Sequence, residues 1–437
     1  MSPVEASFIM FAGMMVLILT GIPLVFALGG ASVALGYFLV GPQMLSIAYS
    51  SAFGVLGEFV LLAVPLFIFM GAMLQVSGVA DALYAAIYTW SGGLRGGLAI
   101  GTVGISTLMA AMTGISGAAC VSMGLIALPS MLKRGYDKHI AMGSIMAGAA
   151  LGELIPPSVI FILWGLFADV SIGKLFAGGL FPGLVLSGIF MLYIGIRAYL
   201  QPELCPSIPR SERLTGKEKI ASLRNLILPI VLMLVVLVAI FSGAATPTEA
   251  AAVGAFGSIF CSWFARTLSW KVVKDAARNS VLISGMAGWI IIGAYSFTAV
   301  YSATGGPGVV QNFVSSSGLD RWVIFALMQL SFFILGCLLD PSAIIMITVP
   351  IYLPLVKMLG FDPVWYGVVF CVNMEMAYLT PPFGFNLFYI RGVVPPGITM
   401  ADIYRSVPPF VVLQAIGLII TIVFPQLALW LPNKLFR

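Results

Sequence analysis

The chain has 437 residues, of which 60% are hydrophobic and only 8% are charged, and its mean hydropathy is +1.09. Soluble domains carry about a quarter of charged residues, so this composition excludes a soluble protein and indicates a polytopic membrane protein. The net charge of +5 does not indicate a nucleic-acid partner, because the basic residues lie in short segments between apolar runs and form no basic face with interleaved aromatic residues.

The first half of the chain contains five predicted membrane spans. No Lys or Arg precedes the first apolar run, so we expect the first span to be retained rather than cleaved as a signal peptide. The five spans lie at about 6–22, 23–40, 58–76, 140–165 and 178–195. A further apolar region at 97–132 is interrupted by "MTGISGAA" and could form either two full spans or one re-entrant hairpin.

A hydrophilic linker at 196–225 leads to a second half of similar organisation. Its spans lie at about 226–242, 248–265, 282–301, 364–390 and 408–431. The apolar region at 322–357 is interrupted by "LLDPSAI" and offers the same choice between two spans and a hairpin. The segment 266–280 is basic and amphipathic, so we expect a helix along the cytoplasmic surface, either as a brace for a fixed scaffold or without a mechanical role.

The basic residues predict the orientation of the chain. If the linker is cytoplasmic and both interrupted regions return to the side from which they enter, most of the 21 Lys and Arg residues lie in cytoplasmic segments. Two full spans in each region give the same sidedness. The hairpin prediction therefore rests on other evidence.

That evidence is an internal repeat. The segments 117–157 and 342–382 align without a gap. Three features occupy matching positions in both segments: a proline, then the loop "RGYD" or "LGFD", then a double proline. Five crossings in each half is an odd number, so the second half, 226–437, would be inverted relative to the first, 1–195. The sequence predicts an all-α polytopic membrane protein, an inverted-repeat elevator-type transporter with two re-entrant hairpins and two broken helices.

Two predicted helix breaks occupy corresponding places in the repeats. "GELIPPS" (152–158) and "YLTPPFGFN" (378–386) each contain a double proline, which removes backbone donors. In a membrane, the freed backbone groups are tolerated where they are buried in protein or line a cavity. Unwound carbonyls suit Na⁺, and half-helix N-termini attract an anion. The alternative is that the prolines merely kink ordinary spans.

Two polar tips would complete the sites. "TGISG" (113–117) and "LDPSA" (339–343) could bring hydroxyl groups and carbonyls against the two breaks, giving two cation sites that flank one anion site. The candidate cation ligands are Thr113, Gly114, Ser116, Gly152, Ile155, Pro156, Asp340, Ser342, Leu379, Thr380 and Pro381. The candidate substrate-binding residues are Gly117, Glu153, Ser158, Pro382, Gly384, Asn386 and Arg391.

Several of these side chains have alternative roles. Glu153 lies inside a span and could hold a cation, carry a proton or bond a neighbouring helix. Asp340 could bind a cation, although a turn before proline is the simpler interpretation. Asn386 could cap a helix or contact substrate, and Arg391 is more typical of an interfacial cation than of a carboxylate partner. Glu249 in "TPTE" predicts a capping box.

At these residues the chain resembles the DctM-like large membrane subunit of tripartite ATP-independent periplasmic (TRAP) transporters, over essentially its whole length. The most specific motifs are "GAATPTEAAAVGA", "GISGAA", "RGYD", "GELIPPS", "GFDPVWYGVV" and "LTPPFGFNLFYIRGV". The resemblance implies an elevator mechanism with sodium ions where each hairpin tip meets its broken helix. It also implies import of a small organic anion across the bacterial inner membrane, with a soluble periplasmic binding protein and a small four-helix membrane subunit, expected here as a separate polypeptide.

One departure from the family pattern concerns the first tip. It reads "GISGAAC", where many relatives have a second hydroxyl residue after "SG", so Ala118 would contribute only its backbone to the first cation site. The ending "PPFGFNLFYIRGV" is most similar to the branch linked to monocarboxylates, 2-oxo acids or aromatic acids.

Three other functions compete with this interpretation. A stand-alone Na⁺- or H⁺-coupled carboxylate or ion carrier would share the repeats but need no binding protein. An intramembrane enzyme would need a nucleophile with a base, or clustered metal ligands, and the sequence shows neither at membrane depth. A channel is disfavoured only by the closed tips that hairpins would form.

Overall fold

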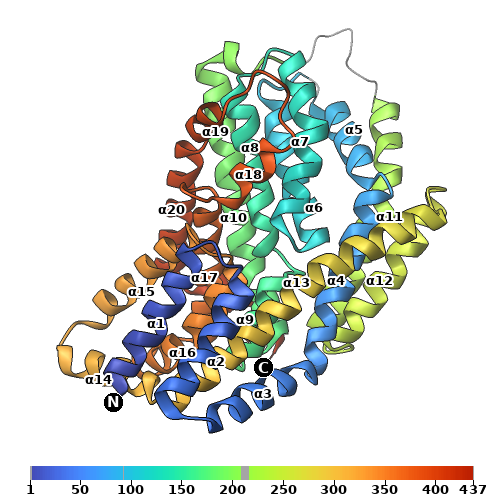
Figure 1. Cartoon of the computed structure of the whole chain (residues 1–437). Coiled ribbons are helices and arrows are strands. Elements are labelled where there is room, and N and C mark those ends of the chain that lie inside the picture. The colour runs from blue at the N-terminus through green and yellow to red at the C-terminus, as the bar shows by residue number, and fades with distance from the viewer. Residues whose placement is uncertain (1, 92, 208–215, 437) are drawn as a thin grey trace.

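The computed structural model describes residues 2–91, 93–207 and 216–436, and within these ranges the chain forms helices and no β-strand. Six of the described helices are long and apolar enough to cross a membrane. The prediction of an all-α polytopic membrane protein is therefore confirmed. Figure 1 shows the helices as a bundle crossed obliquely by one long helix, α13.

The first half of the chain contains ten α-helices and two short 3₁₀ helices. In chain order these are α1 (Pro3–Leu19), α2 (Leu24–Val40), α3 (Gln43–Leu56), η1 (Phe59–Leu62), α4 (Ala63–Val76), α5 (Val79–Ser91), α6 (Gly97–Thr113), α7 (Ser116–Lys133), α8 (Lys138–Ala150), η2 (Leu151–Glu153), α9 (Val159–Ala168) and α10 (Ile172–Leu200).

The second half follows a related order. After η3 (Pro202–Leu204) come α11 (Gly216–Phe241), α12 (Pro247–Phe264), α13 (Trp270–Ala303), α14 (Gly306–Ser317), α15 (Arg321–Gly336), α16 (Pro341–Met358), α17 (Pro363–Tyr378), α18 (Phe385–Arg391), α19 (Met400–Ser406), α20 (Pro408–Val423) and α21 (Gln426–Leu435).

The two interrupted apolar regions are each a pair of helices joined by a short tip. The first pair is α6 and α7, and the second is α15 and α16. In Figure 1 the first pair lies in the upper half of the view and the second pair in the lower half. Whether each pair returns to the membrane face from which it enters stays a prediction.

Two predicted elements were wrong. The expected single span at 408–431 is two helices, because Pro425 removes a backbone donor and Phe424 before it leaves the helical conformation. The segment 266–280 is not a separate surface helix: from Trp270 it is continuous with the following span in α13. Its 34 residues rise by about 51 Å at 1.5 Å per residue, more than the hydrocarbon core of about 30 Å.

Helix packing divides the chain into two groups. The outer group comprises α1 to α4 with α11 to α13; within it α13 packs on α2, α3 and α4, and α12 packs on α4. The inner group comprises α6 to α10 with α15 to α21; within it α8 packs on α6 and α7, and α17 packs on α15 and α20. The helices α5 and α14 connect the groups in the chain. Packing between the groups includes α13 against α16 and α4 against α6.

The repeated "RGYD" and "LGFD" loops act as helix starts. Asp137 accepts hydrogen bonds from the backbone N–H groups of His139 (3.0 Å) and Ile140 (3.0 Å) at the start of α8. Asp362 accepts the equivalent bonds from Val364 (2.7 Å) and Trp365 (3.1 Å) at the start of α17. Each carboxylate satisfies donors that a helix N-terminus leaves unpaired. These two caps fix where the broken helices begin.

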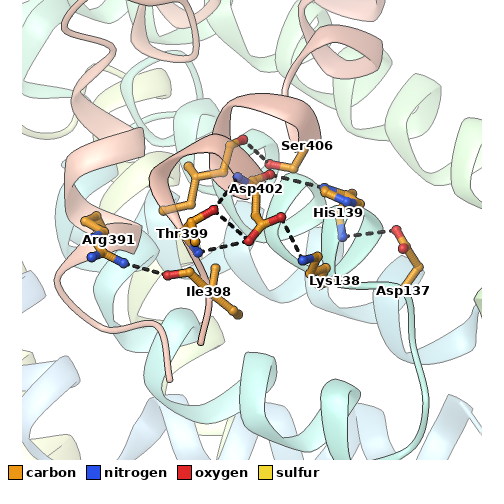
Figure 2. Close-up of polar contacts among 9 residues, drawn as sticks. Asp137, Lys138, His139, Arg391, Ile398, Thr399, Asp402 and Ser406 are labelled. Atoms are coloured by element: carbon orange, nitrogen blue, oxygen red, sulfur yellow. Dashed lines mark hydrogen bonds and ion pairs between the residues drawn. The ribbon is translucent and has the colours of Figure 1, made fainter. Parts of the chain in front are cut away.

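A polar cluster fastens the start of α8 to α19 (Figure 2). The Lys138 Nζ lies 2.7 Å from Asp402 Oδ1, and the ring Nδ1 of His139 lies 3.1 Å from the Asp402 backbone oxygen. Asp402 also forms a capping box with Thr399. His139, the only histidine in the sequence, lies in the first turn of α8 and is half-buried.

Candidate functional site

The first tip lies directly against the first break. Gly114 adopts a left-handed conformation (φ +65°) that ends α6 and allows α7 to begin at Ser116. A Cβ atom at Gly114 would lie 2.9 Å from the Pro157 carbonyl oxygen. Only glycine combines this backbone conformation with so close an approach. The predicted junction of tip and break is present in the first repeat.

The first break is buried along its whole length. Residues 152–158 are all buried, and Ser158 caps α9 by accepting a hydrogen bond from the Phe161 N–H at 3.3 Å. The Ser158 hydroxyl itself donates to the Glu153 carbonyl. On α10, Gly179 and Gly183 leave room for the break, because a Cβ atom at either would lie 2.3 Å from atoms of the break. The interruption is therefore an ordered turn packed between helices.

The second tip and the second break also meet. Asp340 caps α16 by accepting a hydrogen bond from the Ser342 N–H at 2.9 Å, which agrees with the turn expected there. The Phe383 N–H of the break donates to the Cys337 carbonyl at 3.2 Å. The Thr380 hydroxyl donates to the Met376 carbonyl of its own helix at 2.8 Å.

Asn386 links the two halves of the site. Its Oδ1 accepts a hydrogen bond from the Ser116 hydroxyl at 2.7 Å, and its Nδ2 donates to the Met146 carbonyl at 3.0 Å. The Cys120 Sγ also lies 3.7 Å from the Asn386 backbone oxygen. Asn386 is fully buried, so these bonds are protected from water. One side chain of the second break therefore positions the first tip.

A cavity of about 410 Å³ lies between the two tips and α13. Six predicted site residues line it: Gly114, Ser116, Gly117, Glu153, Asp340 and Ser342. Apart from Ala118, which was expected to contribute only its backbone, the sequence analysis did not propose the other lining residues: Ile68, Gln75, Ile115, Val121, Val159, Ile160, Ile283, Met286, Ala287, Ile290, Tyr378 and Tyr389. Tyr378 is the first residue of the segment "YLTPPFGFN" that contains the second break, and Gln75 is a polar residue within an apolar span, so the sequence held a signal for both.

The wall of the cavity is acidic and apolar. Glu153 and Asp340 contribute carboxyl groups, and no Lys, Arg or His occurs among the described residues that line the cavity. Glu153 is 5% exposed, its Oε2 has no hydrogen-bond partner among the described residues, and its carboxyl interacts with the Tyr378 hydroxyl. A lone carboxylate ligand in this cavity would be repelled unless a cation or a proton offsets the charge of the wall.

The oxygen groups around the tips are of the type that hard cations bind. The first junction offers the hydroxyls of Thr113 and Ser116, the Pro157 carbonyl and the unpartnered Glu153 oxygen. Na⁺ binds such oxygen ligands, whereas transition metals prefer imidazole and thiolate groups. No group of three His, Cys, Asp or Glu residues suited to a metal ion occurs in the described part of the chain.

The remaining candidate residues lie outside the lining of this cavity. They are Thr113, Gly152, Ile155, Pro156, Ser158, Leu379, Thr380, Pro381, Pro382, Gly384, Asn386 and Arg391. Thr113 lines a smaller neighbouring cavity of about 160 Å³, which shares Gln75 and Ile115 with the larger one. Arg391 is exposed and donates to the Ile398 carbonyl at 2.6 Å, as Figure 2 shows. In this structure its guanidinium stabilises the connector between α18 and α19.

Comparisons with known proteins agree over almost the whole chain. The family described as "Tripartite ATP-independent periplasmic transporter, DctM component" matches residues 11–427. The C4-dicarboxylate TRAP transporter large permease protein DctM of Pseudomonas aeruginosa is 34% identical over 407 residues, covering 93% of this chain and 94% of the relative. The ectoine TRAP transporter large permease protein TeaC of Halomonas elongata is 27% identical over 432 residues, covering 98% and 99%.

A solved structure supports the fold independently. The Alcanivorax borkumensis YdaH transporter superposes with a TM-score of 0.63 at 15% identity, covering 94% of this chain and 97% of that protein. At this identity the likeness concerns the fold alone. The chain therefore belongs to the DctM family: it is the large membrane subunit of a tripartite ATP-independent periplasmic transporter, and not an enzyme.

Proposed function

We propose that this subunit imports a small organic anion across the bacterial inner membrane, driven by a sodium gradient, after a periplasmic binding protein delivers the anion. The observation that carries the proposal is the acidic cavity at the two tips. An anion that enters beside Glu153 and Asp340, with no basic side chain described in the wall, needs a cation or a proton to offset the repulsion. Bound Na⁺ would supply that charge, so binding of the anion and of the cation would be coupled.

The packing of the helices supports an elevator movement. The inner group contains both tips, both breaks and most of the cavity lining, and the outer group contains α13, which lies across it. Movement of the inner group as one body would carry the site across the membrane while the outer group stays fixed. The outer group would be the scaffold and the inner group the transport domain.

The exposed faces of the outer group suit a membrane partner. The family is tripartite, and a small membrane subunit would extend the scaffold. Phe256 and Trp263 on α12 and Trp270 at the start of α13 are exposed, as expected where lipid or a second subunit covers the helices. The names of relatives cover C4-dicarboxylates and ectoine, so the particular cargo of this chain is left to experiment.

Transport measurements test the proposal directly. The chain is reconstituted with its small subunit in proteoliposomes, and the cognate binding protein is loaded with labelled monocarboxylates, 2-oxo acids, aromatic acids or C4-dicarboxylates. Uptake is compared under an inward Na⁺ gradient, an inward K⁺ gradient and an inward proton gradient at one membrane potential. We expect uptake of one class of acid with Na⁺ alone.

A pair of serine variants links the result to the site. Ser116→Ala removes a hydroxyl from the first tip and should raise the Na⁺ concentration for half-maximal uptake at least several-fold. Ser144→Ala is the matched control, because Ser144 is also buried but bonds only the Ala141 carbonyl of its own helix. Uptake that follows the proton gradient and ignores Na⁺ would contradict the sodium assignment and direct attention to Glu153.

A further inference from the structure

Among the described residues, one side chain in each repeat forms hydrogen bonds that join the outer group to the inner group. On α4, the Gln75 Nε2 donates to the Ser122 hydroxyl of α7 at 2.6 Å, and it lies 3.5 Å from the Ala118 carbonyl. On α13, the Thr298 hydroxyl donates to the Met346 carbonyl of α16 at 3.2 Å. Both bonds run from an outer helix to the second helix of a hairpin.

The positions of these bonds follow the internal repeat. The alignment that places 117–157 on 342–382 puts Ser122 one residue from the position of Met346. By the order of elements in the two repeats, α4 of the first repeat corresponds to the second part of α13 in the second repeat. The residue types differ, a glutamine in one half and a threonine in the other, yet each reaches the same helix of its hairpin. The arrangement is thus a property of the fold in both halves.

The carbonyl bonded by Thr298 has lost its ordinary partner. In a regular helix the Met346 carbonyl would accept a hydrogen bond from the N–H of residue 350. Residue 350 is Pro350, which lies inside α16 and has no N–H. The Thr298 hydroxyl therefore satisfies a buried acceptor that would otherwise be unpaired, and breaking this bond inside a membrane has a cost.

We propose that Gln75 and Thr298 are positioning residues that hold the two hairpins against the outer group in this conformation. The inference rests on the proposed elevator movement, since both bonds must break when the inner group moves along the outer group. Gln75 also lines the cavity whereas Thr298 does not, so cargo can reach the first bond but not the second. The two bonds would set the balance between this conformation and the next.

The experiment measures that balance in the reconstituted complex with the small subunit. A fluorescence donor and acceptor are attached at exposed positions, Leu125 on α7 and Phe38 on α2, one in each group. The five native cysteines are buried, so cysteines introduced at the two sites react first. Single-molecule distances are recorded in NaCl and in choline chloride without organic acid, and the wild type is expected to show two distances.

Four variants separate the hydrogen bonds from packing. Thr298→Val and Ser122→Ala each remove one bond and should reduce the population of the present conformation about fivefold relative to the other. Thr298→Ser restores the hydroxyl and should restore the wild-type ratio. Ser296→Ala is the matched control, because Ser296 bonds the Ala48 carbonyl of α3 at 3.2 Å, entirely within the outer group, and should leave the ratio unchanged.

A proline variant tests the reason for the second bond. Pro350→Ala supplies an N–H that can bond the Met346 carbonyl, so Thr298→Val should have a smaller effect in that background. If two distances are seen and the ratio of their populations is the same in Thr298→Val, Ser122→Ala and the wild type, the inference is overturned. The proposed elevator movement would then still be supported. A Thr298→Ser ratio equal to that of Thr298→Val would also overturn the inference. One distance in every variant and salt would overturn both the inference and the elevator.

Discussion

The two helix breaks of this transporter each contain a double proline, but they differ in how far they are buried. Residues 152–158 of the first break are all buried, whereas Pro381, Pro382 and Phe383 of the second are exposed. The first break is covered because Gly179 and Gly183 of α10 allow close packing. The helices that follow the second break, α18, α19 and α20, contain no glycine before Gly417. Prolines and caps therefore create a break in a helix, while the packing of the neighbouring helix determines whether that break is buried.

The difference also separates two ways of fixing a tip. The first tip is fixed by the close contact of Gly114 with Pro157 and by the buried side chain of Asn386. The second tip is fixed by a backbone hydrogen bond from Phe383 to Cys337. Side-chain substitutions should therefore damage the first tip far more than the second.

The largest effect is expected at Gly114. Gly114→Ala combines a left-handed backbone, which costs an alanine about 1–2 kcal/mol, with a Cβ only 2.9 Å from the Pro157 oxygen. We expect a loss of transport of more than tenfold and a lower melting temperature. Gly318→Ala is the control, because Gly318 has nearly the same φ, +64°, with no atom within 4 Å of the added Cβ. Equal effects of the two variants would refute the tip contact.

A smaller effect is expected at Asn386. Asn386→Ala leaves the Met146 carbonyl and the Ser116 hydroxyl without their buried partner, which should cost about 2 kcal/mol of unfolding free energy. Phe383→Ala keeps the backbone bond to Cys337, and its ring is 50% exposed, so it should cost less than about 1 kcal/mol. Unfolding in detergent measures both. A larger loss for Phe383→Ala would reverse the comparison of the two tips.

The smallest effects are expected where the repeats agree. Asp137→Ala and Asp362→Ala each remove a helix cap with two backbone hydrogen bonds and should each cost about 1 kcal/mol. The same unfolding measurement applies. Losses that differ severalfold between the two variants would show that the two loops are not equivalent.

The sequence predicted the parts of the fold that depend on local chemistry. The double prolines and the capping box at Glu249 were visible as residue patterns, and each has the expected local structure, whereas the capping by Asp137 and Asp362 in the repeated loops was not predicted. The helices α3, α5 and α14 were missed because their apolar stretches are short. The break before Pro425 was missed because the flanking residues are uniformly apolar.

The cavity was predictable only in part. The tip residues Ser116 and Ser342 and the acidic Glu153 and Asp340 were found because polar groups are rare inside apolar segments. The wall formed by α13 was not found, since its apolar residues resemble those that face lipid. The bond from Ser116 to Asn386 joins residues 270 positions apart, and no local pattern reveals it.

The central claim is that the site at the tips binds sodium, and thermal stability tests it most directly. The complex is melted in NaCl, KCl and choline chloride, since a ligand that binds only the folded state raises the melting temperature. We predict a rise specific to Na⁺ that Ser116→Ala and Ser342→Ala each reduce and Ser144→Ala does not. Equal melting temperatures in the three salts would contradict the claim.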